Sequence, residues 1–238
     1  MTTSQSVPAN YIGVWQRHLL ETTASKDDSS LVFWMQTQHH HIDIRLPITR
    51  NKISSVAALA DYTDADLLIL AQQQGFAGVT QVEIGNEKTS DVCQWLREID
   101  FQPATGTRDI GKMLFTDENT LIETGLDSAY LELWRRLENG QSPVSFAFVN
   151  GVNHAGLVVP AYQMRVGRYV AYARPRCSVL PKASSLLACI DIHQPSREQL
   201  LNWLDMEISF GEIVDEKHWE IKHSTMPFKE GTSLKLLA

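Results

Sequence analysis

The chain has 238 residues, of which 43% are hydrophobic and 21% charged, and its formal net charge is −7. This composition is typical of a globular protein with a substantial hydrophobic core. The acidic balance and the lack of any Lys/Arg run argue against nucleic-acid binding, and no apolar run is long enough for a membrane span.

The first half of the chain consists mainly of short strands. Alternation of apolar and polar residues predicts strands at 11–21, 31–37, 40–46, 76–84, 93–103, 112–115 and 121–123. The stretch 54–74 has a helical pattern instead, with Thr63 as the cap of a turn that begins at Asp64. Gly75 is expected to end this helical stretch.

The second half repeats this organisation. Strands are predicted at 130–137, 146–149, 157–164, 168–173, 207–214 and 219–223. Asn150-Gly151 is a strong signal for a two-residue hairpin turn. Ser196, with Gln199 three residues later, predicts a capped helix that ends at Leu204. Many short strands with few helices favour antiparallel barrels or a sandwich.

An internal repeat suggests where the chain divides. The spacing Tyr-x3-Trp-x-Arg occurs at Tyr11, Trp15 and Arg17, and again 119 residues later, from Tyr130 to Arg136. Half the chain length separates the two copies, so the pattern predicts two similar barrels in tandem. The expected domains are 1–126 and 127–238.

A family resemblance rests on several short motifs. Gly13-Val14-Trp15 resembles the G-x-W signature of lipocalin-like barrels, in which the tryptophan plugs the closed end. The further motifs are 34–37, 42–47, 74–78, 123–125 and Tyr130-x-Glu132-x-Trp134. Together they resemble the HRI protein family, which implies two lipocalin-like antiparallel β-barrel domains in tandem and no particular chemistry. In the second half, Glu132 stands where the signature has glycine.

Arg97 is the most informative polar residue. Within the strand 93–103, period-2 alternation places it on an apolar face with Trp95, Ile99 and Phe101. An unpaired buried charge costs several kcal/mol, on the order of 3–5. We therefore expect a carboxylate partner from another strand, Glu132 or Glu123, or an anionic ligand. A structural ion pair and a ligand anchor are both compatible with this pattern.

The candidate ligand-binding set combines these polar residues with aromatic ones. Glu132 lies between Tyr130 and Trp134 on one strand face, as Arg97 lies next to Trp95. Tryptophan side chains line cavities or fill barrel cores. The predicted ligand-binding residues are Trp34, Trp95, Arg97, Tyr130, Glu132 and Trp134. No catalytic set can be assigned.

The run His39-His40-His41 is the only candidate for metal binding. His39 and His41 share a strand face with Asp43, but nothing selects a third ligand from the remaining histidines. The alternative is a solvated strand face that also carries Arg45. We predict no metal and no cofactor.

These observations support three hypotheses of function. The first is a lipocalin-like binding protein for a small, largely apolar ligand with a polar or acidic head group. The second is a barrel enzyme of the isomerase, cyclase or hydrolyase type. The third is a protein-interaction module, either a homodimer or a complex with another protein. The N-terminus has no secretion signal and the three cysteines are unpatterned, so a cytoplasmic location is expected.

Overall fold

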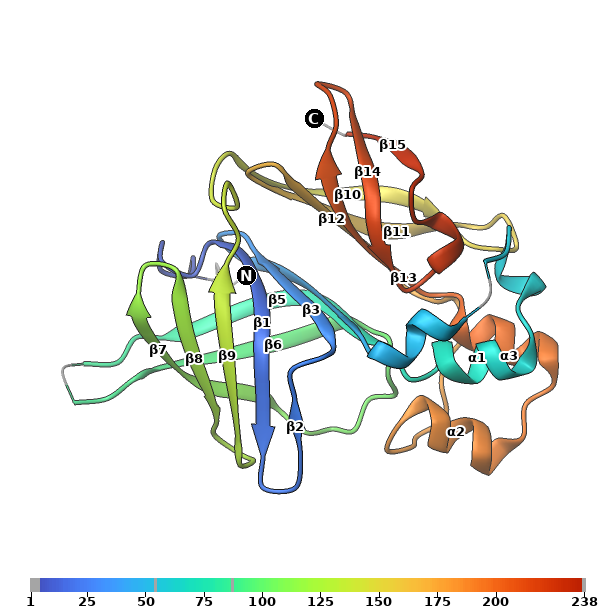
Figure 1. Cartoon of the computed structure of the whole chain (residues 1–238), viewed down its shortest axis with the longest axis horizontal. Helices are drawn as coiled ribbons and strands as arrows, with labels where there is room; N and C mark the ends of the chain where they lie inside the picture. The colour runs from blue at the N-terminus through green and yellow to red at the C-terminus, as the bar shows by residue number, and fades with distance from the viewer. Residues whose placement is uncertain (1–4, 54, 87, 237–238) are drawn as a thin grey trace.

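The computed structural model describes residues 5–53, 55–86 and 88–236, which form two antiparallel sheets and a few short helices (Figure 1). The first sheet contains β1 (Gly13–Thr22), β2 (Lys26–Asp27), β3 (Leu31–Gln36), β4 (His40–Leu46), β5 (Gln74–Glu83), β6 (Asp91–Asp100), β7 (Asp109–Asp117), β8 (Thr120–Gly125) and β9 (Tyr130–Arg136). The second contains β10 (Val144–Val152), β11 (Val158–Val166), β12 (Tyr169–Arg174), β13 (Glu207–Ile213), β14 (His218–Ser224) and β15 (Ser233–Lys235). The predicted mainly-β fold is confirmed.

The first sheet closes into a barrel. β9 pairs antiparallel with β8 and also with β1, where Arg17 lies opposite Trp134. The second sheet is curled but open, because no pairing among the described residues joins β10 to β15. The chain therefore consists of a closed barrel followed by a partly closed one.

The internal repeat does not mark equivalent strands. Trp15 lies on β1 and Trp134 on β9, and these two strands are paired neighbours in a single barrel. The prediction that the two tryptophans occupy corresponding strands of two barrels is therefore wrong. β9 begins beyond residue 126, the expected domain boundary, yet its pairing places it in the first sheet.

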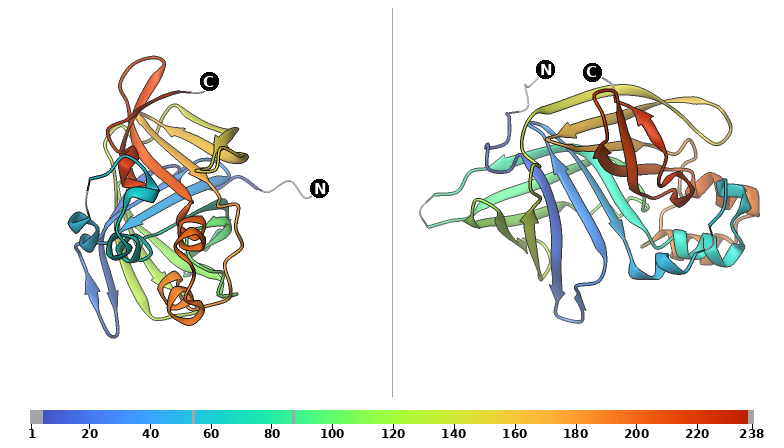
Figure 2. Two further views of the ribbon diagram at one scale, coloured as in Figure 1. Left: turned by 90° about the vertical axis from the view of Figure 1, so that its right-hand side faces the viewer. Right: turned by 45° about the horizontal axis from the view of Figure 1, so that its top comes forward.

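The helices gather at one end of the molecule (Figures 1 and 2). They are η1 (Ile48–Lys52), η2 (Leu59–Asp61), α1 (Asp64–Leu70), α2 (Leu186–His193), α3 (Arg197–Leu204) and η3 (Pro227–Lys229). The predicted caps are confirmed: Thr63 accepts a hydrogen bond from Asp66 N, and Ser196 from Gln199 N. In the described ranges no helix has the length and hydropathy to cross a bilayer.

One predicted turn is wrong. Asn150 and Gly151 lie within β10, and the hairpin turn occurs at 153–157 instead. A Cβ at Gly151 would come within 2.3 Å of Tyr172 Oη and 2.8 Å of Arg174 Cδ. Glycine at this position therefore permits close packing against β12 rather than a turn.

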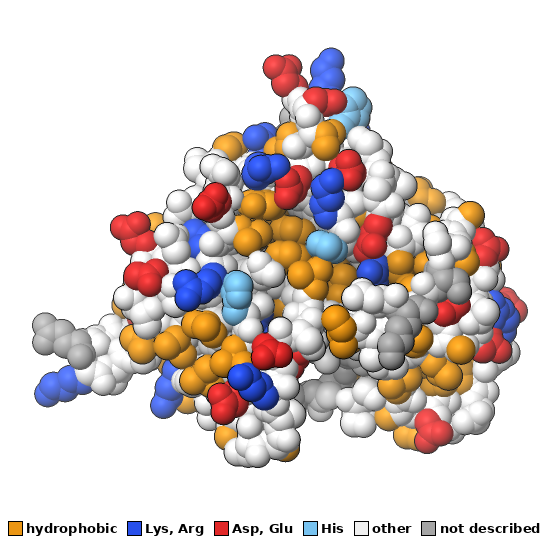
Figure 3. Space-filling model, in the orientation of Figure 1, with side chains coloured by type: hydrophobic (Ala, Val, Ile, Leu, Met, Phe, Trp, Pro, Cys, Tyr) orange, Lys and Arg blue, Asp and Glu red, His pale blue; other side chains and the backbone are white. Residues whose placement is uncertain are grey.

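Two hydrophobic cores follow from the alternation of the barrel strands. Inward-facing residues such as Trp15 and Trp34 fill the barrel. Outward-facing residues of β3 and β4, such as Phe33 and Ile44, pack instead against the second sheet. We call this outer contact the seam, and Figure 3 shows hydrophobic side chains gathered along it. Both faces of these strands are buried, so the second sheet and the barrel form one packed body.

Candidate functional site

The barrel interior is almost full. Trp34 packs against Trp15, Trp95 and Trp134, with ring-centroid distances of 6.2, 5.6 and 5.9 Å. The cavity that remains beside them has a volume of about 10 Å³. That is close to the ~10–15 Å³ needed for one water and far below the ~300 Å³ at which ligand sites begin.

A chain of ion pairs lines the wall of this interior. Arg17 Nη1 donates to Glu132 Oε1 (2.7 Å), and Arg17 Nη2 donates to Asp27 Oδ2 (2.8 Å). Arg45 Nη1 lies 3.5 Å from the same Glu132 oxygen, while Arg45 Nε donates to Asp43 Oδ1 (2.8 Å). One oxygen of Glu132 thus contacts both Arg17 and Arg45. The sequence suggested Arg97 as its partner, and Arg97 is neither of these two.

Glu123 is the unneutralised acid of this network. It lies directly opposite Glu132 in the β8–β9 pair and is buried. Tyr130 Oη donates to its Oε1 (2.6 Å) and Trp134 Nε1 to its Oε2 (3.2 Å). Burial and the neighbouring Glu132 carboxylate raise the pKa of Glu123 well above its ordinary value. Two arginines pair with Glu132, whereas Glu123 has no ion-pair partner among the described residues, so burial favours the neutral form of the Glu123 carboxyl.

A β-bulge decides where Arg97 lies. Ala77 pairs with Ile99 and Gly78 with Arg97, so Glu98 is an extra residue on β6. The bulge reverses the alternation, which leaves Trp95 and Arg97 on the barrel side and turns Ile99 to the seam. Single-face placement of Trp95, Arg97, Ile99 and Phe101 was therefore wrong.

The Arg97 guanidinium is held by two carboxylates and a ring. Its Nε and Nη2 donate to Asp109 Oδ2 (3.0 and 2.6 Å), and its Nη1 donates to Asp100 Oδ2 (3.0 Å). The guanidinium carbon lies 3.7 Å from the centre of the Phe76 ring. The predicted carboxylate partner on another strand is Asp109 of β7, in place of Glu123 or Glu132.

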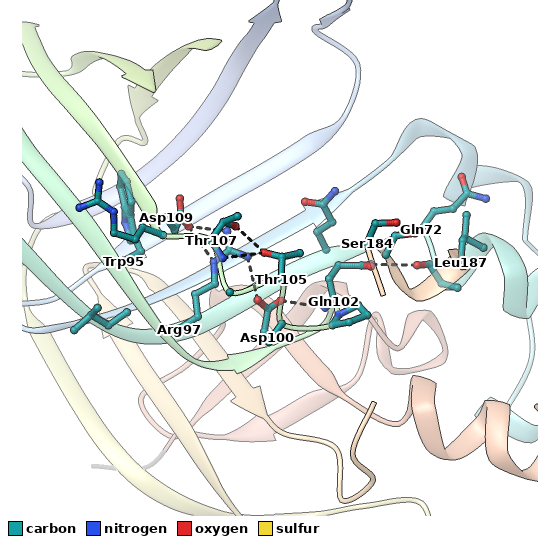
Figure 4. Close-up of a pocket in the computed structure, with 18 of the residues that line it drawn as sticks. Gln72, Trp95, Arg97, Asp100, Gln102, Thr105, Thr107, Asp109, Ser184 and Leu187 are labelled. Atoms are coloured by element: carbon teal, nitrogen blue, oxygen red, sulfur yellow. Dashed lines mark hydrogen bonds and ion pairs between the residues drawn. The ribbon is translucent and has the colours of Figure 1, made fainter. Parts of the chain in front are cut away.

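These charged residues border a groove of about 820 Å³ that we call the β6–β7 groove (Figure 4). Three segments form its walls: the α1–β5 connection, the strand β6 with its connection to β7, and the start of α2. Side chains that line it include Gln72, Gln74, Gln94, Trp95, Arg97, Asp100, Gln102, Thr105, Thr107, Asp109, Ser184 and Leu187.

Gln102 ties these walls together. Its side-chain amide donates to the carbonyl of Ala71 (3.1 Å), and its Oε1 accepts from the backbone N–H of Leu186 (2.7 Å). The side chain of Gln102 therefore links the α1–β5 connection to the start of α2. Ser185 caps α2 by accepting from Ala188 N (3.1 Å).

The six predicted ligand-binding residues divide into two groups. Trp95 and Arg97 line the β6–β7 groove. Trp34 and Trp134 border the water-sized cavity, and Tyr130 and Glu132 belong to the internal hydrogen-bond and ion-pair network. Trp95 lines both cavities, so its side chain separates the groove from the barrel interior. A ligand-binding role for the six remains a prediction.

Sequence reasoning missed much of the groove. Its outer wall is the connection 101–108, whose Pro103 and Gly106 are turn signals in a stretch that was assigned in part to a strand. Ser184 and Leu187 belong to the region of α2, for which no helix was predicted. Asp109 follows this connection directly as the first residue of β7, and no pattern in the sequence sets it apart.

The three histidines of the run differ in burial: His39 and His40 are half-buried and His41 is buried. His41 is fully buried in the barrel, where its Nδ1 shares a hydrogen bond with Thr80 Oγ1 (3.0 Å) and burial lowers its pKa to about 3. Asp43 is also buried, so the expected solvated face was wrong. Within the described ranges no cluster of three or more His, Cys, Asp or Glu residues could hold a metal ion.

Comparison with known proteins supports the fold. No family model and no curated protein matches the chain. Among solved structures, it is similar to the crystal structure of the uncharacterised protein YLR301w from Saccharomyces cerevisiae. The TM-score is 0.51 and the identity 13%, over 94% of this chain and 84% of that chain. At this identity the likeness shows a shared fold alone, and membership of the HRI family remains a prediction.

Proposed function

We propose that this protein binds a small, neutral molecule rich in hydroxyl or amide groups in the β6–β7 groove. The observation that carries the proposal is the groove itself, with its volume of about 820 Å³ and its lining from both halves of the chain. Ligand sites are commonly ~300–1,000 Å³ and favour the junctions between structural units.

The charges of the groove favour a neutral ligand. Arg97 is paired with both Asp100 and Asp109, and Arg108 forms an ion pair with Asp127 (2.7 Å). A charged ligand would have to displace one of these partners, which leaves the displaced carboxylate or guanidinium without compensation. A neutral ligand leaves every pair in place.

Unused amide and hydroxyl groups favour a hydrogen-bonding ligand. The side chains of Gln74, Gln94 and Ser184 line the groove, and they make no hydrogen bond to another described residue. Each amide offers donors and an acceptor. The largely apolar ligand expected from the sequence suits this lining less well, because it would cover these groups without pairing them. Trp95 and Leu187 provide a limited apolar contact.

A substitution that fills the groove tests the proposal. Ala104 lines the groove and is exposed, so Ala104→Trp adds bulk to the cavity without disturbing the core. Ala24, exposed in the β1–β2 turn, gives the matched control Ala24→Trp. The probes are neutral mono- and disaccharides and N-acetylated amino-acid amides, screened by the shift in Tm of the full chain.

We expect at least one probe to stabilise the parent and Ala24→Trp but not Ala104→Trp. The stabilisation is about 2.7 kcal/mol at a hundredfold excess over Kd. Equal stabilisation of both variants would place the ligand elsewhere. A screen in which only charged or apolar additives act would contradict the proposed ligand class.

A further inference from the structure

A second cavity, of about 290 Å³, lies away from the β6–β7 groove and shares none of its lining residues. It forms where the end of the β10–β11 hairpin meets η2, α3 and η3. The side chains of Leu59, Val152, Leu201, Met226 and Phe228 make most of its wall apolar. Its size matches the smallest ligand sites, which begin near ~300 Å³.

One end of this cavity is polar and tightly organised. Arg174 and Asp205 are both buried, and Arg174 Nη2 donates to Asp205 Oδ1 (2.6 Å). The other carboxylate oxygen, Oδ2, accepts from the backbone N–H of His154 (3.2 Å) and lies 2.7 Å from His154 Nδ1. All three residues line the cavity.

The hydrogen bonds define the tautomer of His154. Although burial opposes ionisation of Asp205, the hydrogen bond from His154 and the charge of Arg174 hold the pKa of Asp205 below its usual range. An ionised carboxylate only accepts, so His154 Nδ1 must carry the proton. In the neutral form of the ring the lone pair then lies on Nε2, which has no hydrogen-bond partner among the described residues.

The remaining charges at this end cancel. Arg174 pairs with Asp205, and Lys229 pairs with Glu207, whose Oε2 also lies 3.9 Å from Arg174 Nε. No charge is left to attract an ionic ligand. The cavity thus combines an apolar wall, a neutral electrostatic balance and the partly exposed ring of His154, whose Nε2 no described residue uses.

We propose that this cavity is a second ligand site, which takes a small, mainly apolar molecule with a single hydroxyl group that donates to His154 Nε2. A phenol has this chemistry. Its ring covers the apolar wall, and its hydroxyl donates to His154 Nε2, an acceptor that no described residue uses.

Two matched probes separate the hydrogen bond from simple apolar filling. We compare p-cresol with toluene, which has the same ring and methyl group but no hydroxyl, by NMR titration of the full-length chain. His154→Phe keeps a flat ring and removes the acceptor, and His18→Phe changes an exposed histidine on β1 as the control. We expect His154→Phe to weaken p-cresol binding about tenfold, to the level of toluene, and to leave toluene binding unchanged. His18→Phe should alter neither.

Filling the cavity provides the second arm of the test. Leu201→Trp from α3, or Ala60→Trp from η2 if the first variant does not fold, should abolish binding of both probes. The groove variant Ala104→Trp should leave the binding of p-cresol and toluene unchanged. A negative result for the second cavity is therefore distinguishable from a negative result for the β6–β7 groove. Equal affinity for the two probes, binding that survives filling, or shifts confined to the β6–β7 groove would overturn the proposal.

Discussion

Arg97 contacts two carboxylates and an aromatic ring, while about a third of its side chain, 33%, remains exposed. Asp100 and Asp109 both face it, so removal of the guanidinium leaves two like charges close together. Solvent screens part of this repulsion because the site opens into the groove. The energetic effect should therefore lie between that of a buried pair and that of a surface pair.

We expect Arg97→Met to lower the free energy of unfolding by about 1–3 kcal/mol, because it removes three charge-assisted hydrogen bonds at a partly exposed site. Urea denaturation measures this change. Arg108→Met is the control, since Arg108 on the β6–β7 connection forms an exposed ion pair with Asp127, whose loss should have a clearly smaller effect. Equal effects of the two substitutions would show that Arg97 has no special structural role.

Glu123 gives the barrel interior a dependence on pH. Its raised pKa means that the folded state binds this proton more tightly than the unfolded state. The resulting stabilisation is complete below the unfolded pKa of about 4.3 and is lost as the pH rises towards the folded pKa. Gln at this position cannot ionise, keeps one acceptor oxygen for Trp134 Nε1, and can donate from its amide nitrogen to the Tyr130 hydroxyl.

We expect the stability of Glu123→Gln, relative to the parent, to increase with pH above about pH 4.3, by at most ~1.4 kcal/mol per pH unit. Denaturation at several pH values between 4 and 8 measures the difference in free energy of unfolding between Glu123→Gln and the parent. The carboxylates that both proteins share contribute equally and do not affect this difference. Asp127→Asn, at the exposed pair, is the control for loss of a carboxylate. Parallel stability curves for Glu123→Gln and the parent would contradict a protonated Glu123.

At the level of single elements, the sequence predicted strands and helix caps that depend on residues close together in the chain. The strands β3, β4, β7 and β8 follow the predicted alternation, and the caps Thr63 and Ser196 occur as expected. These features depend on residues a few positions apart, so the sequence displays them directly.

The bulge on β6 depends on a partner strand, and no pattern within β6 reveals it. A Cβ at Gly78 would lie 2.0 Å from the carbonyl oxygen of Leu96, so the close approach at the bulge requires glycine there. Glu98 is thereby left over, and every residue after it changes sides. The candidate site was therefore predicted only in part: Trp95 and Arg97 precede the bulge, whereas the partners Asp100 and Asp109 depend on it.

At the scale of the whole molecule, the seam joins the barrel to the second sheet. The Phe33 and Phe210 rings stack with centroids 4.4 Å apart. A Cβ at Gly75 would come within 2.8 Å of Ile208 Cδ1, which shows how closely β5 and β13 approach. Arg50 adds a polar tie, since its Nε donates to Gln73 Oε1 (3.1 Å) and its Nη2 to the Ser224 carbonyl (2.8 Å). The alternation of single strands could not show this, because it identifies an apolar face but not the sheet that covers it.

We expect the two sheets to unfold together because their largest apolar cluster is shared. Ile44 is buried in that cluster and faces out of the barrel. Ile44→Asp places a charge in the seam and should cost about 3–5 kcal/mol. Hydrogen exchange read by mass spectrometry should then show faster exchange in β11, β12 and β13 as well as in β3 and β4.

The control for this test uses the same chemistry on an open part of the barrel. Leu114 lies on β7 and is 53% exposed, so Leu114→Asp adds the same charge without burying it. Its effect should stay within about 0.5 kcal/mol, with no change in exchange in the second sheet. If Ile44→Asp accelerated exchange in the barrel alone, the seam would be a contact between two independently stable domains. Faster exchange in both sheets requires instead that each sheet depends on the apolar face of the other.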